Sequence, residues 1–211
     1  MDRLADFILV RCALTDPTNL AQAASDFCAQ SHLPMRLHRA AWSDPTQVAY
    51  VYGHLVTSAM VTDEQVAALS QQWQQVCPQA KSVEVSRLAL AFDAPGQSLG
   101  QGVNYHYVVE TDPEPGWADE IARWYDMEHM PGLAAVPGCI HARRLLNHDS
   151  GPLSFACYDL VSDQTLASPA WLAVRGTAWS DRARPHFTNT RRTMMRVMNR
   201  ISHDRIESIR S

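Results

Sequence analysis

The 211-residue sequence lacks an excess of positive charge, a long apolar run and closely spaced cysteines. Its formal net charge is −4, whereas nucleic-acid binding needs a basic surface, so we expect no nucleic-acid partner. The apolar run at residues 7–10 is too short to cross a bilayer, and acidic residues stand where a signal peptide would be basic. We therefore expect a cytoplasmic protein without a membrane partner.

Motifs for metal, phosphate and nucleophile chemistry are also missing. The five cysteines are odd in number and scattered, so we expect reduced thiols rather than a zinc or iron–sulfur site. Glu128, His129 and His186 lack the short spacings of a metal-binding motif, and we expect neither a metal nor a cofactor. No glycine-rich phosphate loop or nucleophile elbow is present, which argues against kinases, dinucleotide-binding enzymes and serine hydrolases.

Hydrophobic residues make up 46% of the chain, enough for a sizeable core, and their periodicity predicts alternating strands and helices. In the first half it predicts strands at 7–14, 35–42, 47–56 and 82–91, with helices at 20–30 and 63–76. After a linker rich in glycine and proline, the second half repeats this order. There the predicted strands are 104–110, 138–146, 154–160 and 190–198, and the predicted helices are 117–130 and 166–176.

This order predicts an α+β fold of two tandem ferredoxin-like βαββαβ repeats with antiparallel sheets. We assign residues 1–92 to the first repeat, 93–102 to the linker, 103–199 to the second repeat and 200–211 to a C-terminal tail. An offset of 97 residues aligns the first helix of each half, and the apolar positions and the final proline coincide. The aligned pairs are Trp117 with Leu20, Ile121 with Ala24, Trp124 with Phe27, His129 with His32, and Pro131 with Pro34.

The helix predicted at 117–130 carries the most reactive side chains. At 100° per residue, Glu128 falls on the apolar stripe one turn after Trp124, while Tyr125 and His129 share the edge of that stripe. In one interpretation the helix ends early, before Pro131, and Glu128 reaches water or a backbone amide. In the other, these three side chains line a cavity and act as acid–base and hydrogen-bonding groups. His129 and its counterpart in the first half could instead cap helix C-termini.

A second dense stretch, at residues 177–187, precedes the last predicted strand. Trp179, Arg182 and His186 in an irregular loop could form a lid over a pocket. Alternatively, Arg182 and Arg184 are solvated and Trp179 packs under the loop.

Several of these segments resemble the dimeric α/β-barrel superfamily, and in particular its EthD-like members, in which a W-Y-x-x-E-H-x-P helix end leads into a V-P-G turn. The resemblance covers roughly residues 103–198, and the first half matches only in element order and in one short segment. The matching segments are Trp124–Pro131, Val136–Gly138, Ala142–Arg144, Ser168–Trp171, Trp179 and Pro185–Phe187.

The resemblance implies that two ferredoxin-like sheets close a barrel, within one chain or across a homodimer. It also implies a pocket between sheet and helices near Tyr125, Glu128 and His129. We expect a cofactor-independent enzyme, oxygenase-like or isomerase-like, that acts on an aromatic or lactone-type organic acid in the C-terminal repeat. His129 would move a proton, Glu128 would orient the imidazole of His129, and Tyr125 would donate a hydrogen bond to the substrate. The further substrate-binding candidates are Arg143, Trp124, Trp179 and His186. The alternative is a non-catalytic ligand-binding or assembly protein.

Overall fold

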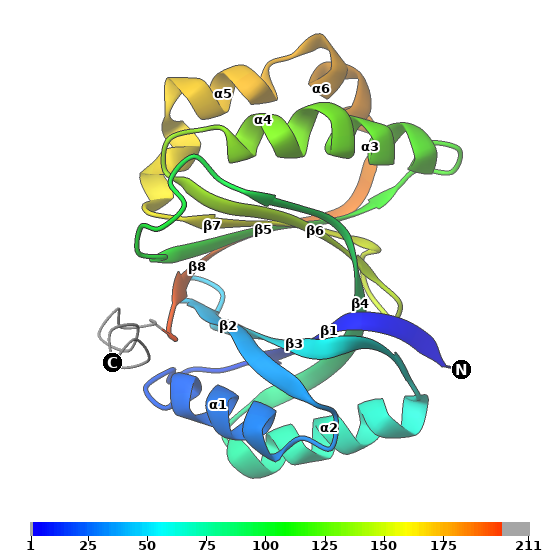
Figure 1. Ribbon diagram of the computed structural model, residues 1–211, viewed down its shortest axis with the longest axis vertical. Helices are drawn as coiled ribbons and strands as arrows, with labels where there is room; N and C mark the ends of the chain where they lie inside the picture. Colours follow the sequence, from blue (N-terminus) through cyan, green and yellow to red (C-terminus); the bar gives the residue numbers. More distant parts are fainter. Residues whose placement is uncertain (1, 200–211) are drawn as a thin grey trace, which may run out of the picture.

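Eight strands form one antiparallel sheet that closes into a barrel (Figure 1). The computed structural model describes residues 2–199. Around the barrel the order is β1-β3-β2-β8-β5-β7-β6-β4, so each half of the chain contributes four neighbouring strands. The strands are β1 (Arg3–Ala13), β2 (Met35–Ser43), β3 (Val48–Val61), β4 (Lys81–Pro95), β5 (Tyr105–Pro113), β6 (Cys139–Asn147), β7 (Ser154–Leu160) and β8 (Phe187–Val197).

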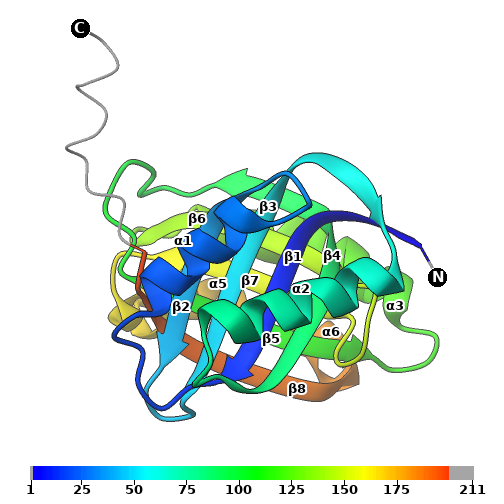
Figure 2. The same cartoon turned by 90° about the horizontal axis from the view of Figure 1, so that it is seen from below.

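Helices cover the outside of the barrel on two opposite sides (Figure 1). In the first half α1 and α2 lie side by side across the sheet (Figure 2), and in the second half the helices from α3 to α6 do the same. Among the described residues, no helix is long and apolar enough to span a membrane. The helices are α1 (Leu20–Gln30), α2 (Asp63–Val76), α3 (Ala118–Trp124), the π-helix η1 (Tyr125–His129), α4 (Met130–Ala134), α5 (Pro169–Arg175) and α6 (Ala178–Ala183), with short 3₁₀ turns η2 (Asp163–Ala167) and η3 (Arg184–His186).

Alternation along the strands divides the apolar residues among three cores, since successive side chains point to opposite faces of a sheet. One core, with Phe27 and Trp73, fills the space between the first half of the sheet and α1 and α2. A second, with Trp124 and Tyr158, lies between the other half and its helices. The third, with Leu9, fills the interior of the barrel. The barrel is therefore a packed structure and not a channel.

Two seams join the halves, and they differ in length. Strands β4 and β6 pair over a long ladder, from Leu88 opposite Asn147 to Pro95 opposite His141. Among the described residues, strands β2 and β8 pair at two positions, Ala41 with Val197 and Trp42 with Arg196, and the backbone N–H of Met198 donates to the carbonyl of Ala40 (2.8 Å) just beyond them. The predicted antiparallel α+β fold and its closure as a barrel are confirmed, and the barrel closes within one chain.

The linker predicted at 93–102 is partly wrong. Strand β4 continues to Pro95, and the turn after it is tied to the second half through backbone hydrogen bonds from Gly96 to Ile140 (2.8 Å) and from Ser98 to Cys139 (2.8 Å). Gly96 is needed here because a Cβ atom on it would lie 2.3 Å from the carbonyl oxygen of Cys139. Gly96 thus marks a close backbone contact, and the start of the predicted linker is not a free connection.

Two further predictions about the second half need correction. The irregular loop predicted at 177–187 contains α6 and the turn η3. Thr177 caps α6, since its side chain accepts a hydrogen bond from the backbone N–H of Ser180. The helix predicted to end at Met130 continues to Ala134. The predicted tail at 200–211 lies outside the described residues.

Candidate functional site

A π turn at Tyr125–His129 organises the site. Pro131 has no N–H to donate, so a regular α-helical ladder is interrupted at this point. The chain responds with a wider turn, in which the backbone N–H of Met130 bonds to the carbonyl of Tyr125, five residues before it. The helix then resumes as α4 with Pro131 in its first turn, where a missing donor costs nothing.

The π turn exchanges the positions expected for Glu128 and His129. In an α-helix the residue four after Trp124 would lie above it, and that residue is Glu128. With one extra residue in the turn, His129 takes this place and is buried, and its ring stacks on the indole of Trp124 at 4.1 Å between centroids. Glu128 is turned outward and half-buried, and its carboxylate accepts a hydrogen bond from the Thr177 hydroxyl (2.6 Å).

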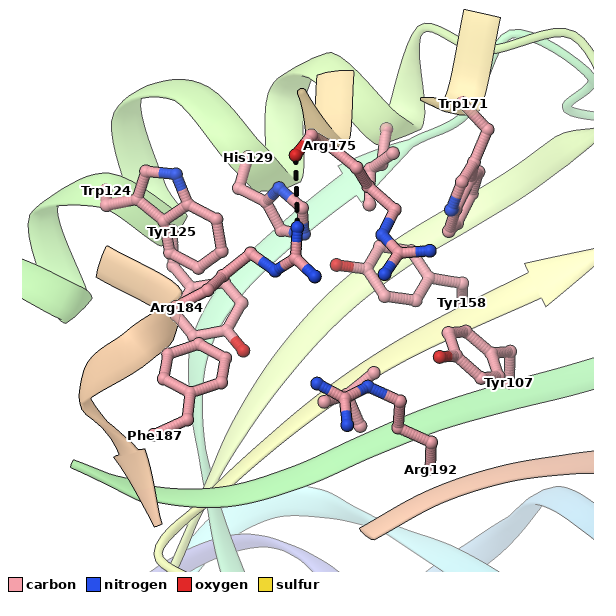
Figure 3. Close-up of a pocket in the computed structure, with 12 residues that line it drawn as sticks. Tyr107, Trp124, Tyr125, His129, Tyr158, Trp171, Arg175, Arg184, Phe187 and Arg192 are labelled. Atoms are coloured by element: carbon pink, nitrogen blue, oxygen red, sulfur yellow. Dashed lines mark hydrogen bonds between the residues drawn. The ribbon is translucent and has the colours of Figure 1, made fainter. Parts of the chain in front are cut away.

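A pocket lies between this helix and the outer face of the sheet (Figure 3). Its helix side is formed by Trp124, Tyr125 and His129, and Arg175 and Arg184 come from α5 and η3. Strands β5, β7 and β8 supply the floor, so elements from the whole second half converge on one point. The other lining residues are Tyr107, Val109, Leu133, Tyr158, Trp171, Phe187 and Arg192.

His129 enters the pocket as a neutral imidazole. Burial, and then the nearby positive charges of Arg184 and Arg175, lower its pKa to about 3. Its Nδ1 atom is buried and has no hydrogen-bond partner among residues 2–199. A buried polar atom without a partner calls for an explanation, and a catalytic or ligand-binding role is one that fits a residue lining a pocket.

Two tyrosines present hydroxyl groups to the same space. Tyr125 is buried, stacks on Phe187 with 6.0 Å between ring centroids, and points its hydroxyl into the pocket (Figure 3). Burial raises its pKa, so the hydroxyl is protonated and can donate a hydrogen bond. The hydroxyl of Tyr158 is different, since it donates to the sulfur of Met130 (3.0 Å) and is already engaged.

Three arginines line the pocket without a carboxylate to neutralise them. Among the described residues, no acidic group lies within ion-pair distance of Arg175, Arg184 or Arg192. Burial and the charges of the other two lower the pKa of Arg184. The Arg184 guanidinium donates to the backbone carbonyl of Arg175 (3.1 Å) and thereby lies across the pocket (Figure 3).

The interior of the pocket is narrow, with a volume of about 30 Å³. This space holds about two water molecules. A ring-sized ligand therefore requires the long arginine side chains to swing aside. Arginine side chains reorient readily because they have several rotatable bonds, whereas the packed aromatic walls are fixed by their neighbours.

Four of the predicted site residues lie outside this pocket. In the part of the chain that the structure describes, no hydrogen bond joins Glu128 to His129, and the Glu128 carboxylate accepts from Thr177 instead. Arg143 faces the interior of the barrel, where its side chain donates a hydrogen bond to Asp93 (2.7 Å). Its neighbour in β6, Ala142, points to the other face of the sheet, toward the helices. Trp179 donates to Glu120 (3.0 Å) on the outer surface.

His186, the last of these four, pairs with Glu114 (2.8 Å) and stacks on Trp117 at 3.4 Å between centroids. It is therefore engaged away from the pocket. The side chain of Arg182 likewise pairs with Glu120 (2.5 Å). Within residues 2–199, Trp179 and His186 thus form no lid over the pocket.

Sequence reasoning found three pocket residues, Trp124, Tyr125 and His129, and missed the sheet floor and the arginines. The alternation of Tyr107 with Val108 along β5 is a signal that could have placed this tyrosine on the helix-facing side. The convergence of Arg175, Arg184 and Arg192 has no such signal, because it depends on how α5, η3 and β8 meet in space.

Comparison with solved structures places this geometry in a known fold. No family model matches the sequence, and no curated protein does. The chain is similar to a candidate monooxygenase from Lactobacillus acidophilus NCFM (TM-score 0.61, 10% identity, covering 93% of this chain and 94% of that one). A candidate monooxygenase from Fusobacterium nucleatum gives a TM-score of 0.61 at 10% identity over 94% and 95% of the two chains.

An anthrone oxidase-like protein is also similar, with a TM-score of 0.60 and 13% identity over 93% of this chain and 92% of that one. These neighbours have the dimeric α/β-barrel, ferredoxin-like fold. At such low identities the likeness shows the fold alone. The fold of the chain is thus that of the dimeric α/β-barrel proteins.

Proposed function

We propose that the protein is a small-molecule enzyme of the oxygenase or isomerase type, acting on an aromatic or lactone-type organic acid in the pocket of the second half. One observation carries the proposal: the unpartnered, neutral imidazole of His129 lies in a pocket whose described lining includes three arginines and no carboxylate. The names of the structural neighbours, candidate monooxygenases and an anthrone oxidase-like protein, support the same class of chemistry.

The proposed roles follow from the charges. The acidic group of the substrate pairs with the arginines, since guanidinium groups bind carboxylates in a planar, two-point geometry. Once these charges are neutralised, the pKa of His129 rises and the imidazole becomes a stronger base. It can then accept a proton from an activated C–H or O–H bond of the substrate. The Tyr125 hydroxyl donates a hydrogen bond to the oxygen on which negative charge develops.

The two reaction types share this proton transfer and differ in the step after it. In an isomerase, His129 returns the proton to another atom of the substrate. In an oxygenase, the substrate carbanion adds to molecular oxygen and the O–O bond then breaks. One oxygen atom stays on the substrate carbon as a carbonyl group, and the other leaves as water with the two protons of the original CH₂ group. Oxygen uptake therefore distinguishes the two versions.

The experiment is a substrate screen with wild type and His129→Gln. Anthrone and a panel of phenolic and lactone acids are incubated with each protein while oxygen and absorbance are recorded. We expect turnover with wild type and a loss of at least ~100-fold with His129→Gln, the size of a typical general-base contribution. His32→Gln serves as the control, because His32 is the exposed counterpart in the first half. Equal turnover by wild type and His129→Gln would remove the catalytic role.

The alternative function is non-catalytic binding of the same acids. It predicts binding of benzoate without turnover of any member of the panel. A cavity that is open to solvent and reaches His129 favours the enzyme, because a closed hydrogen-bonded cluster would need no such opening.

We also propose that the two halves descend from one duplicated unit, that the second half is EthD-like, and that the protein is cytoplasmic. The matching strand orders β4-β1-β3-β2 in the first half and β8-β5-β7-β6 in the second half support the duplication. A superposition of residues 3–95 on residues 105–197 tests it, and helices that fail to overlie when the strands are matched would count against it. The free thiols of all five cysteines agree with a reducing compartment.

A further inference from the structure

The positive charge of the pocket exceeds what one carboxylate needs. Arg175, Arg184 and Arg192 reach it from α5, η3 and β8 respectively. Their mutual repulsion is a cost, which burial makes larger for Arg184, whereas Arg192 is exposed and water screens its charge. Asp181 offsets part of the Arg184 charge, but no carboxylate among the described residues forms an ion pair with any of the three. A site that keeps three guanidinium groups together without an ion-paired carboxylate is suited to a ligand with more than one negative charge.

Three acidic residues of the neighbouring helix are engaged elsewhere. Glu120 pairs with Arg182 (2.5 Å), Asp126 pairs with Arg144 (2.8 Å), and Glu128 accepts from Thr177 (2.6 Å). Each of these contacts turns a carboxylate away from the pocket. None of the three therefore neutralises the arginines.

The three arginines fall into two positions. Arg175 and Arg184 lie on the helix side next to His129, and they are linked through the carbonyl of Arg175. Arg192 extends from β8 on the sheet side, near Tyr107 (Figure 3). Aromatic rings stand between and around these two positions, and the ring of Trp171 packs edge-on against Tyr158 at 5.2 Å.

We infer that the pocket binds an aromatic dianion, a flat ring with two acidic groups. One group pairs with Arg175 and Arg184, the other pairs with Arg192, and the ring packs among the aromatic side chains. This inference rests on the proposed function and specifies its substrate class. On binding, the first acidic group replaces the Arg175 carbonyl as the partner of the Arg184 guanidinium, which opens the pocket.

The test compares affinities for benzoate and for the three benzene dicarboxylates by calorimetry at low ionic strength. The three isomers are included because they place the second carboxylate at different distances across the ring. We expect at least one dicarboxylate to bind ten-fold or more tightly than benzoate. Arg192→Gln should reduce this preference to less than three-fold while changing the affinity for benzoate by less than three-fold.

Two controls separate a specific site from general attraction. Arg196→Gln removes a charge from an exposed position of the same strand, outside the pocket, and should leave the preference unchanged. Arg192→Lys keeps the charge but loses the two-point geometry, and should give an intermediate preference. The unfolding temperature of each variant confirms that it folds.

The outcomes distinguish this inference from the proposed function. Equal affinity for benzoate and all dicarboxylates, or an equal loss of both in Arg192→Gln, overturns the dianion inference and leaves the proposed function standing. If neither benzoate nor any dicarboxylate binds the wild-type protein, both are overturned.

Discussion

The imidazole of His129 stacks on the indole of Trp124, with 4.1 Å between ring centroids and 24° between ring planes. The two residues are five positions apart, which is the spacing that a π turn brings into line. The stacking fixes the orientation of the imidazole in the pocket while its Nδ1 atom has no partner among the described residues. The side chain is therefore held by packing and remains available to a ligand.

The protonation state of His129 should respond to an anion in the pocket. In the free protein, burial and then the charges of Arg184 and Arg175 lower its pKa to about 3. Burial remains when an anion binds, but a bound carboxylate offsets the arginine charges and should raise the pKa part of the way toward its usual range. Nitrogen-detected NMR of the imidazole with and without saturating benzoate measures the shift, and His129→Gln assigns the signals. An unchanged pKa with benzoate bound would mean that the anion lies elsewhere.

Substitutions of Glu128 and Tyr125 should have different consequences for binding. Because Glu128 points away from the pocket, Glu128→Gln should keep the affinity for benzoate within two-fold of wild type. Tyr125→Phe removes a hydroxyl that faces the ligand and should weaken binding by about five-fold, the loss of one neutral hydrogen bond of ~1 kcal/mol. Calorimetry measures both, and a larger loss in Glu128→Gln would restore the role first expected for this carboxylate.

Removing one partner of the ion pair between Arg39 and Asp159 should destabilise the protein strongly, because the pair is buried inside the barrel, where it joins the two halves. The atoms are 2.5 Å apart, and Asp159 also bonds to His106 (2.8 Å). Asp159→Asn leaves Arg39 buried without its counter-ion and should cost about 3 kcal/mol. Urea unfolding gives the value. Glu84→Gln, which breaks a pair whose carboxylate is 54% exposed, is the control and should cost less than about 1 kcal/mol.

Acid should destabilise the protein through its buried histidines. Burial, followed by nearby arginine charges, lowers the pKa of both His38 and His129 to about 3. In the unfolded chain these groups titrate near ~6.5, so below that pH the unfolded state binds more protons than the folded state. The free energy of unfolding should therefore fall as the pH decreases from about 6.5 to about 3, by up to ~1.4 kcal/mol per pH unit for each histidine.

Asp159 adds to this acid sensitivity at lower pH. Burial opposes its ionisation, but Arg39 and His106 hold its pKa well below its usual range. A carboxylate with a depressed pKa stabilises the folded state above its unfolded pKa, and this contribution is lost as the pH falls. Urea midpoints at pH 7, 5 and 4 measure the combined effect. The double variant His38→Gln/His129→Gln should show a shallower dependence between pH 6.5 and 5, and an identical curve would contradict the assignment.

The close contact at Gly96 makes a further prediction. A methyl group there would lie 2.3 Å from the Cys139 carbonyl oxygen, so the backbone must move to accept it. We expect Gly96→Ala to destabilise the protein by about 2 kcal/mol, as for other overpacked sites. Gly102→Ala is the matched control, since nothing lies within 4 Å of its added Cβ, and it should change stability by less than ~0.5 kcal/mol. Thermal unfolding compares the two.

The sequence predicted most of the elements because each depends on local signals. Thr62 and Gln65 form a capping box that opens α2, and alternation marked the strands. The directions of the side chains at Trp124–His129 were predicted only in part, because the prediction assumed a regular α-helix where the chain forms a π turn. One extra residue in a turn moves every later side chain by about one position around the axis, and this exchanged Glu128 for His129.

The rest of the site depends on tertiary structure. Arg175 looks like an ordinary basic residue in the last turn of a helix. Arg192 looks like an ordinary strand residue beside a second arginine. The two side chains line the same pocket as Tyr158 only because the helices pack on the sheet, and this packing cannot be read from either local pattern. The position of Arg143 illustrates the same limit, because a one-residue difference in strand alternation decides whether it faces the helices or the barrel interior.

The unequal seams give the barrel a mechanical asymmetry. The ladder between β4 and β6 is the longer seam between the halves, and the two residue pairs between β2 and β8 form the shorter one. We expect thermal fluctuation to separate the shorter seam before the longer one, because fewer backbone hydrogen bonds hold it. The buried ion pair between Arg39 in β2 and Asp159 in β7 joins the two halves, so we expect local opening of the shorter seam to bring water to it.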